Sequence, residues 1–225
     1  MDITAIFLTL NKMPERWVDF HMKVLKEAID DMPVITVSRK PINFGINIID
    51  TDEPGYVNIY RQLLNGAKIA KTKYIATVED DCLYSKNHFI RFRPKDDEFA
   101  YNRNRWSVFS WGEPQYSLRQ RLSNCSLVAP RELLIEALTE RFDKYNGNPP
   151  ENWMGECGRN KLEKALGITL RKQVDFFSNI SIVQLSHPLG TEKRQQEQWK
   201  AHAQIRAFDI PHWGKAEDII KYYNK

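Results

Sequence analysis

The chain has 225 residues, of which 42% are apolar, and a formal net charge of +4. This composition is ordinary for a soluble globular protein with a substantial core, and no apolar run approaches the ~20 residues that a membrane helix requires. The three cysteines, Cys82, Cys125 and Cys157, are isolated and odd in number, which indicates reduced thiols rather than a disulfide framework or a CxxC metal pair. The N-terminus begins a strand and has no signal-peptide pattern, so we expect a soluble, cytoplasmic protein.

The first half of the chain alternates between strand and helix patterns. The elements expected there are strands at 3–10, 34–38, 47–49 and from Tyr74 to the acids after Val78, and helices at 17–29 and 58–70. Pro33 stops the first helix, and polar residues from Asn11 onward end the first strand. This β-α-β-β-α-β order predicts an α/β fold with a mostly parallel sheet, right-handed crossovers and flanking helices.

The second half has a mixed pattern. The elements expected there are strands at 106–111, 123–129 and 180–185, helices at 131–142 and 152–166, a polar loop at 143–150 and a basic segment at 186–196. No repeat or clear linker divides the chain. We therefore expect a single domain, with the 186–196 segment mobile.

Three adjacent carboxylates, Glu79, Asp80 and Asp81, close the apolar strand that begins at Tyr74. The carboxyl ends of buried parallel strands open onto the ligand crevice of α/β folds. Crowded carboxylates repel one another unless a cation shares the space, and hard oxygen ligands suit Mg²⁺ or Mn²⁺. The alternative is that the acids only favour a helix start, but Ser85, directly before the 86–90 helix pattern, is a better cap. The acids therefore predict a metal–diphosphate site.

Basic residues cluster at four places, namely 91–93, 103–105, 119–121 and 193–194. Such clusters attract the phosphates of a nucleotide donor or of a nucleic-acid backbone. The alternative is a solvated basic face, which is the usual fate of charge runs. The clusters therefore leave nucleic-acid contact open.

The pattern resembles the GT-A class of nucleotide-sugar-dependent glycosyltransferases, particularly family-2-like members, including phage-type enzymes. The matching features are the 3–10 strand with Thr9 and Asn11 at its end, the 58–70 helix, the Glu79-Asp80-Asp81 element in place of the DxD motif, and Ser186-His187 after a late strand. The acidic element departs from a strict Asp-x-Asp. The resemblance implies a Rossmann-related, GT-A-like domain in which residues 1–110 bind the nucleotide sugar and residues 111–225 bind the acceptor.

The resemblance also implies roles at the metal. Asp81 and His187 would bind Mn²⁺ or Mg²⁺, and an imidazole ligand favours Mn²⁺. Glu79 or Asp80 would reach ribose or sugar hydroxyls, or a metal-bound water. His187 has an alternative as a simple turn residue before Pro188. Lys193 and Arg194, in the basic segment that follows His187, would then close over the diphosphate and exclude water, against the alternative of an exposed basic loop.

Further roles concern the donor and the catalytic base. The residues expected to contact the nucleotide are Thr9, Asn11, Arg16, Ser38, Arg39 and Arg61. Glu156 is the expected base for the acceptor hydroxyl, with flanking glycines that permit close approach of a substrate, and Glu151 is its competitor. Glu151 alternatively favours a helix dipole. The aromatic residues of the acceptor half are Trp106, Trp111, Tyr116 and Trp153, which would stack on sugars or bases or else pack in the core.

The sequence thus predicts a metal-dependent glycosyltransferase that moves a sugar from a nucleotide-diphosphate donor, a UDP-sugar by the resemblance, to a hydroxyl acceptor. A hydroxymethylated DNA base and a saccharide are both compatible acceptors. One alternative is a non-catalytic module of the same fold that binds a nucleotide sugar or nucleic acid. The other is a Mg²⁺-dependent phosphohydrolase, although residues 80–84 do not match the Asp-x-Asp-x-Thr/Val pattern of that class.

Overall fold

A computed structural model describes residues 1–150, 155–189 and 205–224 of the chain. Its centre is a seven-stranded sheet in the order β10-β6-β9-β4-β1-β2-β3. The bounds of these strands are β1 Ile3–Leu8, β2 Val34–Ser38, β3 Ile46–Ile49, β4 Tyr74–Glu79, β6 Glu98–Asn102, β9 Leu127–Pro130 and β10 Lys172–Phe176. The strands from β3 to β4 are parallel, β9 runs antiparallel to both of its neighbours, and β10 is parallel to β6. The predicted α/β class with a mixed, mostly parallel sheet is confirmed.

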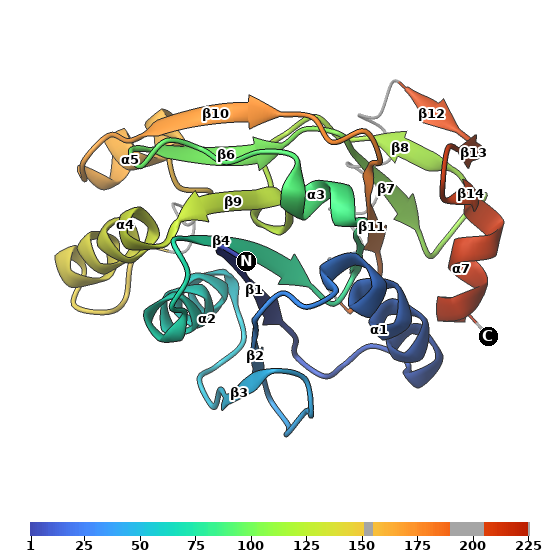
Figure 1. The fold of residues 1–225 in the computed structure, drawn as a ribbon, viewed down its shortest axis with the longest axis horizontal. Helices are drawn as coiled ribbons and strands as arrows, with labels where there is room; N and C mark the ends of the chain where they lie inside the picture. Colours follow the sequence, from blue (N-terminus) through green and yellow to red (C-terminus); the bar gives the residue numbers. More distant parts are fainter. Residues whose placement is uncertain (151–154, 190–204, 225) are drawn as a thin grey trace.

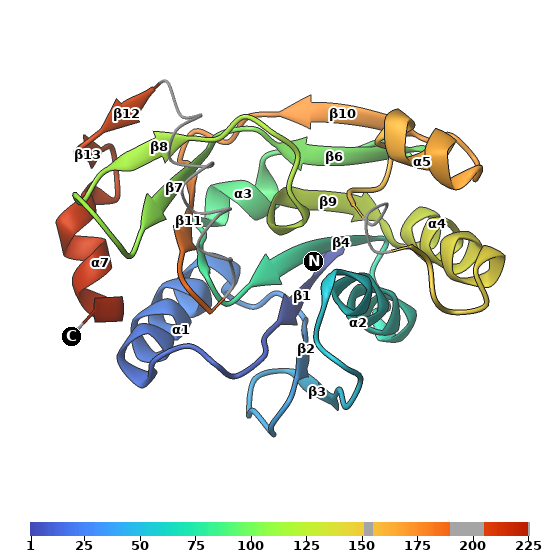
Figure 2. The ribbon, with the colours of Figure 1, turned by 180° about the vertical axis from the view of Figure 1, so that it is seen from behind.

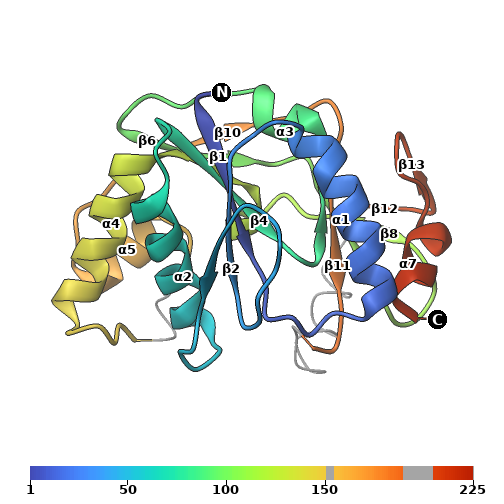
Figure 3. The same ribbon diagram turned by 60° about the horizontal axis from the view of Figure 1, so that its bottom comes forward.

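Helices cover both faces of this sheet (Figures 1 and 3). Helices α1 (Glu15–Ile29) and α3 (Lys86–Ile90) pack on one face, and α2 (Tyr56–Ile69) and α4 (Arg131–Lys144) pack on the other. Every residue of β1 is buried, because a parallel strand between two helical layers has no wet face. The two apolar clusters on the two faces form the core.

A second sheet lies beside the first and has the order β12-β8-β7-β11-β5 (Figure 2). Its strands are β5 Cys82–Leu83, β7 Arg105–Phe109, β8 Tyr116–Leu118, β11 Ile182–Ser186 and β12 Arg206–Ala207. Helix α7 (Ala216–Asn224) packs on this sheet together with the start of α1. The remaining elements are the 3₁₀ helix η1 Asn124–Ser126, helix α5 Asn160–Leu166, and a two-stranded hairpin of β13 Asp209–Ile210 and β14 Gly214–Lys215. Because β5 directly follows the acids, this sheet continues from the end of β4.

Two of the expected elements have other bounds in the structure. The strand expected at 123–129 is only the four residues of β9, because Asn124–Ser126 form η1. The helix expected at 152–166 begins only at Asn160, because residues 155–159 form an irregular loop. Ser85 does occupy the N-cap of α3, but its side chain makes no capping hydrogen bond, and its buried Oγ has no partner among the described residues. No helix in the described ranges combines the length and the apolar character that crossing a membrane would require.

Candidate functional site

A cavity of about 710 Å³ opens where β1, β4 and β11 end. Leu8, the last residue of β1, pairs in register with Glu79, the last residue of β4, so these two strands end side by side. The cavity brings together six of the residues expected in the site, namely Thr9, Glu79, Asp80, Asp81, Glu156 and His187. A position at the carboxyl ends of parallel strands is where α/β folds bind ligands.

Asp81 is held by contacts to β11. Its backbone carbonyl accepts a hydrogen bond from the Leu185 N–H at 2.8 Å. Its Oδ2 accepts one from Gln184 Nε2 at 3.3 Å, and Gln184 Oε1 accepts one from Arg105 Nη1 at 2.5 Å. Arg105 is fully buried, so this Arg105–Gln184–Asp81 chain anchors the carboxylate to the second sheet. The sequence offered one signal for Gln184, which is the polar residue within an otherwise apolar run of β11.

His187 follows β11 and is 7% exposed. Its ring lies 5.6 Å from that of Tyr223, and among the described residues its buried Nδ1 has no hydrogen-bond partner. Burial lowers the pKa of the imidazole, although the charge of Asp81 works in the opposite direction. A neutral imidazole with an unused ring nitrogen, beside a carboxylate, is a donor set that fits Mn²⁺. Asp81 and His187 are therefore the residues of this cavity that would hold a divalent cation.

Asp80 turns toward β1. Thr9 Oγ1 donates to Asp80 Oδ2 at 2.5 Å and itself accepts the N–H of Asn11 at 2.9 Å. Trp17 Nε1 donates to the Asp80 carbonyl at 2.8 Å, which ties the turn to α1. Burial raises the pKa of the Asp80 carboxyl to about 7, with a further increase from Asp81, and the Thr9 hydrogen bond partly opposes them. Asp80 is therefore only partly ionised at neutral pH.

The raised pKa of Asp80 predicts a pH dependence of stability. Between its ordinary value of 3.8 and about 7 the folded chain binds this proton more tightly than the unfolded chain, so the free energy of unfolding falls as pH rises through that window. A shift of this size corresponds to ~4 kcal/mol at most, and we expect about 2 kcal/mol because the cavity admits water. In urea unfolding without divalent cations, wild-type protein should lose that stability relative to Asp80→Asn from pH 4 to pH 8. Parallel curves for the two proteins would contradict the assignment.

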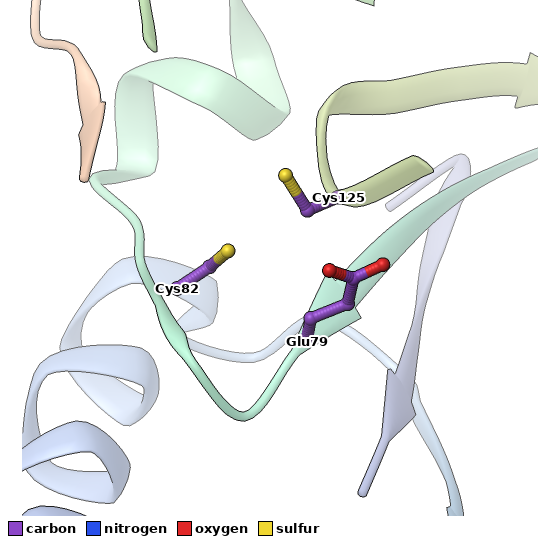
Figure 4. Close-up of side chains that lie close together, drawn as sticks. All are labelled: Glu79, Cys82 and Cys125. Carbon is purple, nitrogen blue, oxygen red and sulfur yellow. The ribbon is translucent and has the colours of Figure 1, made fainter. Parts of the chain in front are cut away.

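Glu79 is the last residue of β4 and the first of the three acids. Its Oε1 accepts a hydrogen bond from Asn124 Nδ2 at 3.2 Å, and its carboxylate lies close to the sulfurs of Cys82 and Cys125 (Figure 4). Burial raises the pKa of Glu79 well above its ordinary value, and the neighbouring Cys125 and Asp81 raise it further. Its role toward ribose or sugar hydroxyls stays a prediction, as does that of Asp80.

Glu156 lines the cavity from the loop before α5. Its side chain is mostly buried and forms an ion pair with Arg159, in which Nη1 lies 3.6 Å from Oε2. The buried Arg141 donates through Nη1 to the Gly155 carbonyl at 2.7 Å, and Tyr101 Oη donates to the Cys157 carbonyl at 2.8 Å. These contacts on either side of Glu156 fix the loop, so its carboxylate is positioned by the core.

The glycines beside Glu156 serve packing. A Cβ at Gly155 would lie 2.2 Å from Leu162 Cδ1. Gly158 has φ +79°, and a Cβ there would meet the Lys172 carbonyl at 3.1 Å. These glycines allow the close approach of the loop to α5 and β10, and the expected close approach of a substrate stays a prediction.

Three of the expected nucleotide residues lie beside the cavity without lining it. Asn11, with φ 54°, accepts the N–H groups of Arg39 and Lys40 on its Oδ1. Ser38 is fully buried and donates to the Lys40 carbonyl at 2.7 Å. Arg39 pairs with Asp50, with Nη2 3.4 Å from Oδ2. Asn11, Ser38 and Arg39 therefore hold the ends of β1 and β2 together, and their contact with a nucleotide stays a prediction.

Two other expected residues do not line the cavity. Arg61 donates to Asp52 Oδ2 at 3.1 Å and to the Gly147 carbonyl at 2.8 Å, so its guanidinium ties α2 to two loops. Arg16 lies over the Tyr222 ring at 5.6 Å, at a separate surface hollow between α1 and α7. We do not carry Arg16 or Arg61 forward as donor ligands.

Several expected residues fall outside the described ranges, namely Glu151, Trp153, Lys193 and Arg194. The described aromatic residues of the acceptor half do not line the cavity. Tyr116 is fully buried and contacts Trp106 edge-on, with 6.5 Å between the rings, and Trp111 contacts Phe109 at 5.1 Å. For Tyr116 and Trp106, which belong to an apolar cluster, the core-packing alternative is the one that the structure supports.

The cavity also contains residues that the sequence analysis did not assign to the site. Among them are Tyr56, Arg103, Arg121, Asn124, Asp175 and Gln184. Arg103 forms an ion pair with Asp175, in which Nη1 lies 3.7 Å from Oδ1. Arg103 and Arg121 belong to two of the basic clusters expected to attract phosphates, and that charge pattern is the signal that could have identified them.

No protein-family model matches the sequence, and no curated protein matches it either. Among solved structures, the chain is similar to a mannosyltransferase from Pyrobaculum calidifontis in complex with GDP-mannose and Mn²⁺, with 13% identity and a TM-score of 0.48 over 88% of this chain and 59% of that one. A glycosyltransferase involved in glycosylation of the PBCV-1 major capsid protein has 11% identity and a TM-score of 0.46, with 89% and 99% covered. A nucleotidyl transferase from Methanothermobacter has 14% identity and a TM-score of 0.42, with 79% and 88% covered. We therefore base the functional proposal on the site's own residues.

Proposed function

We propose that this chain is a cytosolic, metal-dependent glycosyltransferase that moves a sugar from a nucleotide-diphosphate donor, with a UDP-sugar as the first candidate, to a hydroxyl acceptor. The observation that carries the proposal is that Asp81, two residues after β4, and His187, directly after β11, both line one cavity of about 710 Å³. A volume of this size suits a nucleotide sugar.

Different residues of the cavity have different roles in the proposed reaction. A divalent cation held by Asp81 and His187 would stabilise the negative charge that develops on the leaving diphosphate. Arg103 and Arg121 add positive charge to the same cavity wall and favour a bound diphosphate. Glu156 accepts the proton of the acceptor hydroxyl, since its carboxylate reaches the cavity from the opposite half of the chain.

The test is incubation with Mn²⁺ or Mg²⁺ and a panel of nucleotide sugars, starting with UDP-sugars. Metal-dependent release of the nucleoside diphosphate supports sugar transfer or donor hydrolysis. Release of inorganic phosphate instead supports the phosphohydrolase alternative. Measurable affinity for the nucleotide sugar without any turnover supports a non-catalytic module.

The acceptor is tested separately, because a modified DNA base and a saccharide are both hydroxyl acceptors. Products from hydroxymethylated duplex DNA and from saccharides are compared by mass spectrometry. A DNA acceptor predicts binding to the duplex that weakens steeply with salt, because protein contacts to phosphates release counterions. A product found only with saccharides assigns the acceptor to that class.

His187→Gln should change the response to metal. The variant loses an imidazole ligand, so we expect the concentration of Mn²⁺ for half-maximal activation to rise about 10- to 100-fold, with a smaller change for Mg²⁺. Manganese titrations of donor turnover and of Mn²⁺ binding by paramagnetic resonance check this result. His212→Gln, at an exposed histidine, is the matched control. Equal manganese responses of wild type and His187→Gln would remove His187 from the metal site.

A further inference from the structure

Glu79, Cys82 and Cys125 form a cluster beneath the floor of the cavity. One carboxylate oxygen and the two Sγ atoms all lie within 4.8 Å of one another (Figure 4). Among the described residues, this is the one group of three or more His, Cys, Asp or Glu side chains whose possible ligand atoms lie so close to one another. Both cysteines are fully buried, whereas Glu79 lines the cavity, so the cluster borders the cavity at Glu79.

The three side chains come from separate elements that are fixed in place. Cys82 is on β5, where it pairs in register with Gln184 of β11. The backbone carbonyl of Cys125, in η1, accepts a hydrogen bond from Tyr84 Oη at 3.0 Å. Asn124 Nδ2 donates to the Glu79 carboxylate at 3.2 Å and orients it. The cluster is therefore preformed by the fold and does not depend on a flexible loop.

The donor set differs in kind from that of Asp81 and His187. Two thiolates and a carboxylate are ligands for soft or borderline cations, and Mg²⁺ and Mn²⁺ prefer oxygen. Zinc–sulfur bonds of about 2.3 Å in a tetrahedral site place neighbouring ligand atoms roughly 3.8 Å apart, so donors within 4.8 Å need only a small inward movement. The Ser123 hydroxyl, 3.2 Å from Cys125 Sγ, can donate a hydrogen bond to a thiolate there.

We propose that Glu79, Cys82 and Cys125 bind one thiophilic divalent cation, such as Zn²⁺ or Cd²⁺, with ligands other than Asp81 and His187. The two sites adjoin, because the Cys82 thiol donates a hydrogen bond to Asp81 Oδ1 at 3.1 Å and would give up that bond on binding the cation. Binding breaks both S–H bonds and forms two metal–sulfur bonds, and the two thiol protons pass to the solvent together with any proton that the Glu79 carboxyl carries, since burial raises the pKa of that group. The Glu79 carboxylate supplies the third ligand, and a water from the cavity side completes four-coordination. No oxidation state changes.

The first test is a Cd²⁺ titration of the reduced wild-type protein without chelator. We expect an ultraviolet thiolate-to-cadmium charge-transfer band that saturates at one ion per chain, with release of at least two protons per ion and competition by Zn²⁺ but not by Mg²⁺. Native mass spectrometry checks the stoichiometry. A wild-type protein with no such band would overturn the proposal, whatever the variants do.

Variants then assign the ligands. Cys82→Ser and Cys125→Ser should each abolish saturable one-to-one binding, and Glu79→Gln should weaken it by about 10-fold or more. Cys157→Ser is the matched control, because Cys157 is equally buried but lies in the loop before α5, and its band should be unchanged. His187→Gln should also keep the band, which separates this site from the proposed transferase site. An undiminished band in both Cys82→Ser and Cys125→Ser, or its loss in Cys157→Ser, would refute the assignment.

Discussion

Replacing Asp81 by Ala is expected to lower metal-dependent turnover of the donor by at least about 10²- to 10³-fold. The variant loses the carboxylate that, together with His187, would hold the proposed cation. The fold should persist, because the hydrogen bond from Leu185 N–H to residue 81 uses the backbone carbonyl, which Ala retains. The side chain itself contacts only Gln184 and Cys82 by hydrogen bonds that the structure describes. Release of nucleoside diphosphate measures the loss, and circular dichroism with thermal unfolding measures the fold.

Two further variants sharpen this prediction. Asp81→Asn preserves the shape of the side chain and should be nearly as inactive as Asp81→Ala, because the lost charge is what matters. Asp19→Ala, on α1 at the separate surface hollow, is the control for loss of an acid elsewhere and should keep full turnover. Normal turnover in Asp81→Ala would remove the metal argument altogether.

Glu156→Gln should reduce sugar transfer by about 10²- to 10⁴-fold while donor affinity changes little. The amide keeps the size of the side chain but cannot accept the proton of the acceptor hydroxyl. Slow release of nucleoside diphosphate without acceptor should continue, since that reaction does not use the acceptor base. Transfer and donor hydrolysis are measured side by side, and donor affinity is measured by calorimetry.

Two further variants test whether Glu156 is the base. Glu132→Gln, at an exposed position on α4, controls for the change of charge. Glu151→Gln tests the competing acid that lies outside the described residues. If Glu156→Gln transfers sugar at the wild-type rate and Glu151→Gln does not, the base is Glu151.

The first half of the fold was predictable because its signals are local. The runs that became β1 and β4 are apolar on both faces, as central parallel strands between helices must be. Pro33 separates α1 from β2 as expected. The place of the acids in the site was predictable for the same reason, since they follow a parallel strand at the edge where such a sheet binds ligands.

The remainder depended on contacts that no local pattern encodes. The 155–159 loop interrupts the expected helix because Gly155 and Gly158 are packed against other elements, and a helical pattern in the sequence does not reveal such packing. The roles of Gln184 and Cys125 depend on β11 and η1 reaching the end of β4 from far along the chain. Short strands such as β5 have too few residues to show a period of their own.

The pairing of β5 with β11 joins residues about a hundred positions apart, since Cys82 is opposite Gln184. Contacts of such long range slow folding, because the intervening loop must close before they form. During synthesis the acids of β4 emerge from the ribosome well before the strand that anchors Asp81 and leads to His187. Until β11 has been made, the nascent chain lacks the strand that holds Asp81 and leads to His187, so the cavity cannot be completed before most of the chain is available.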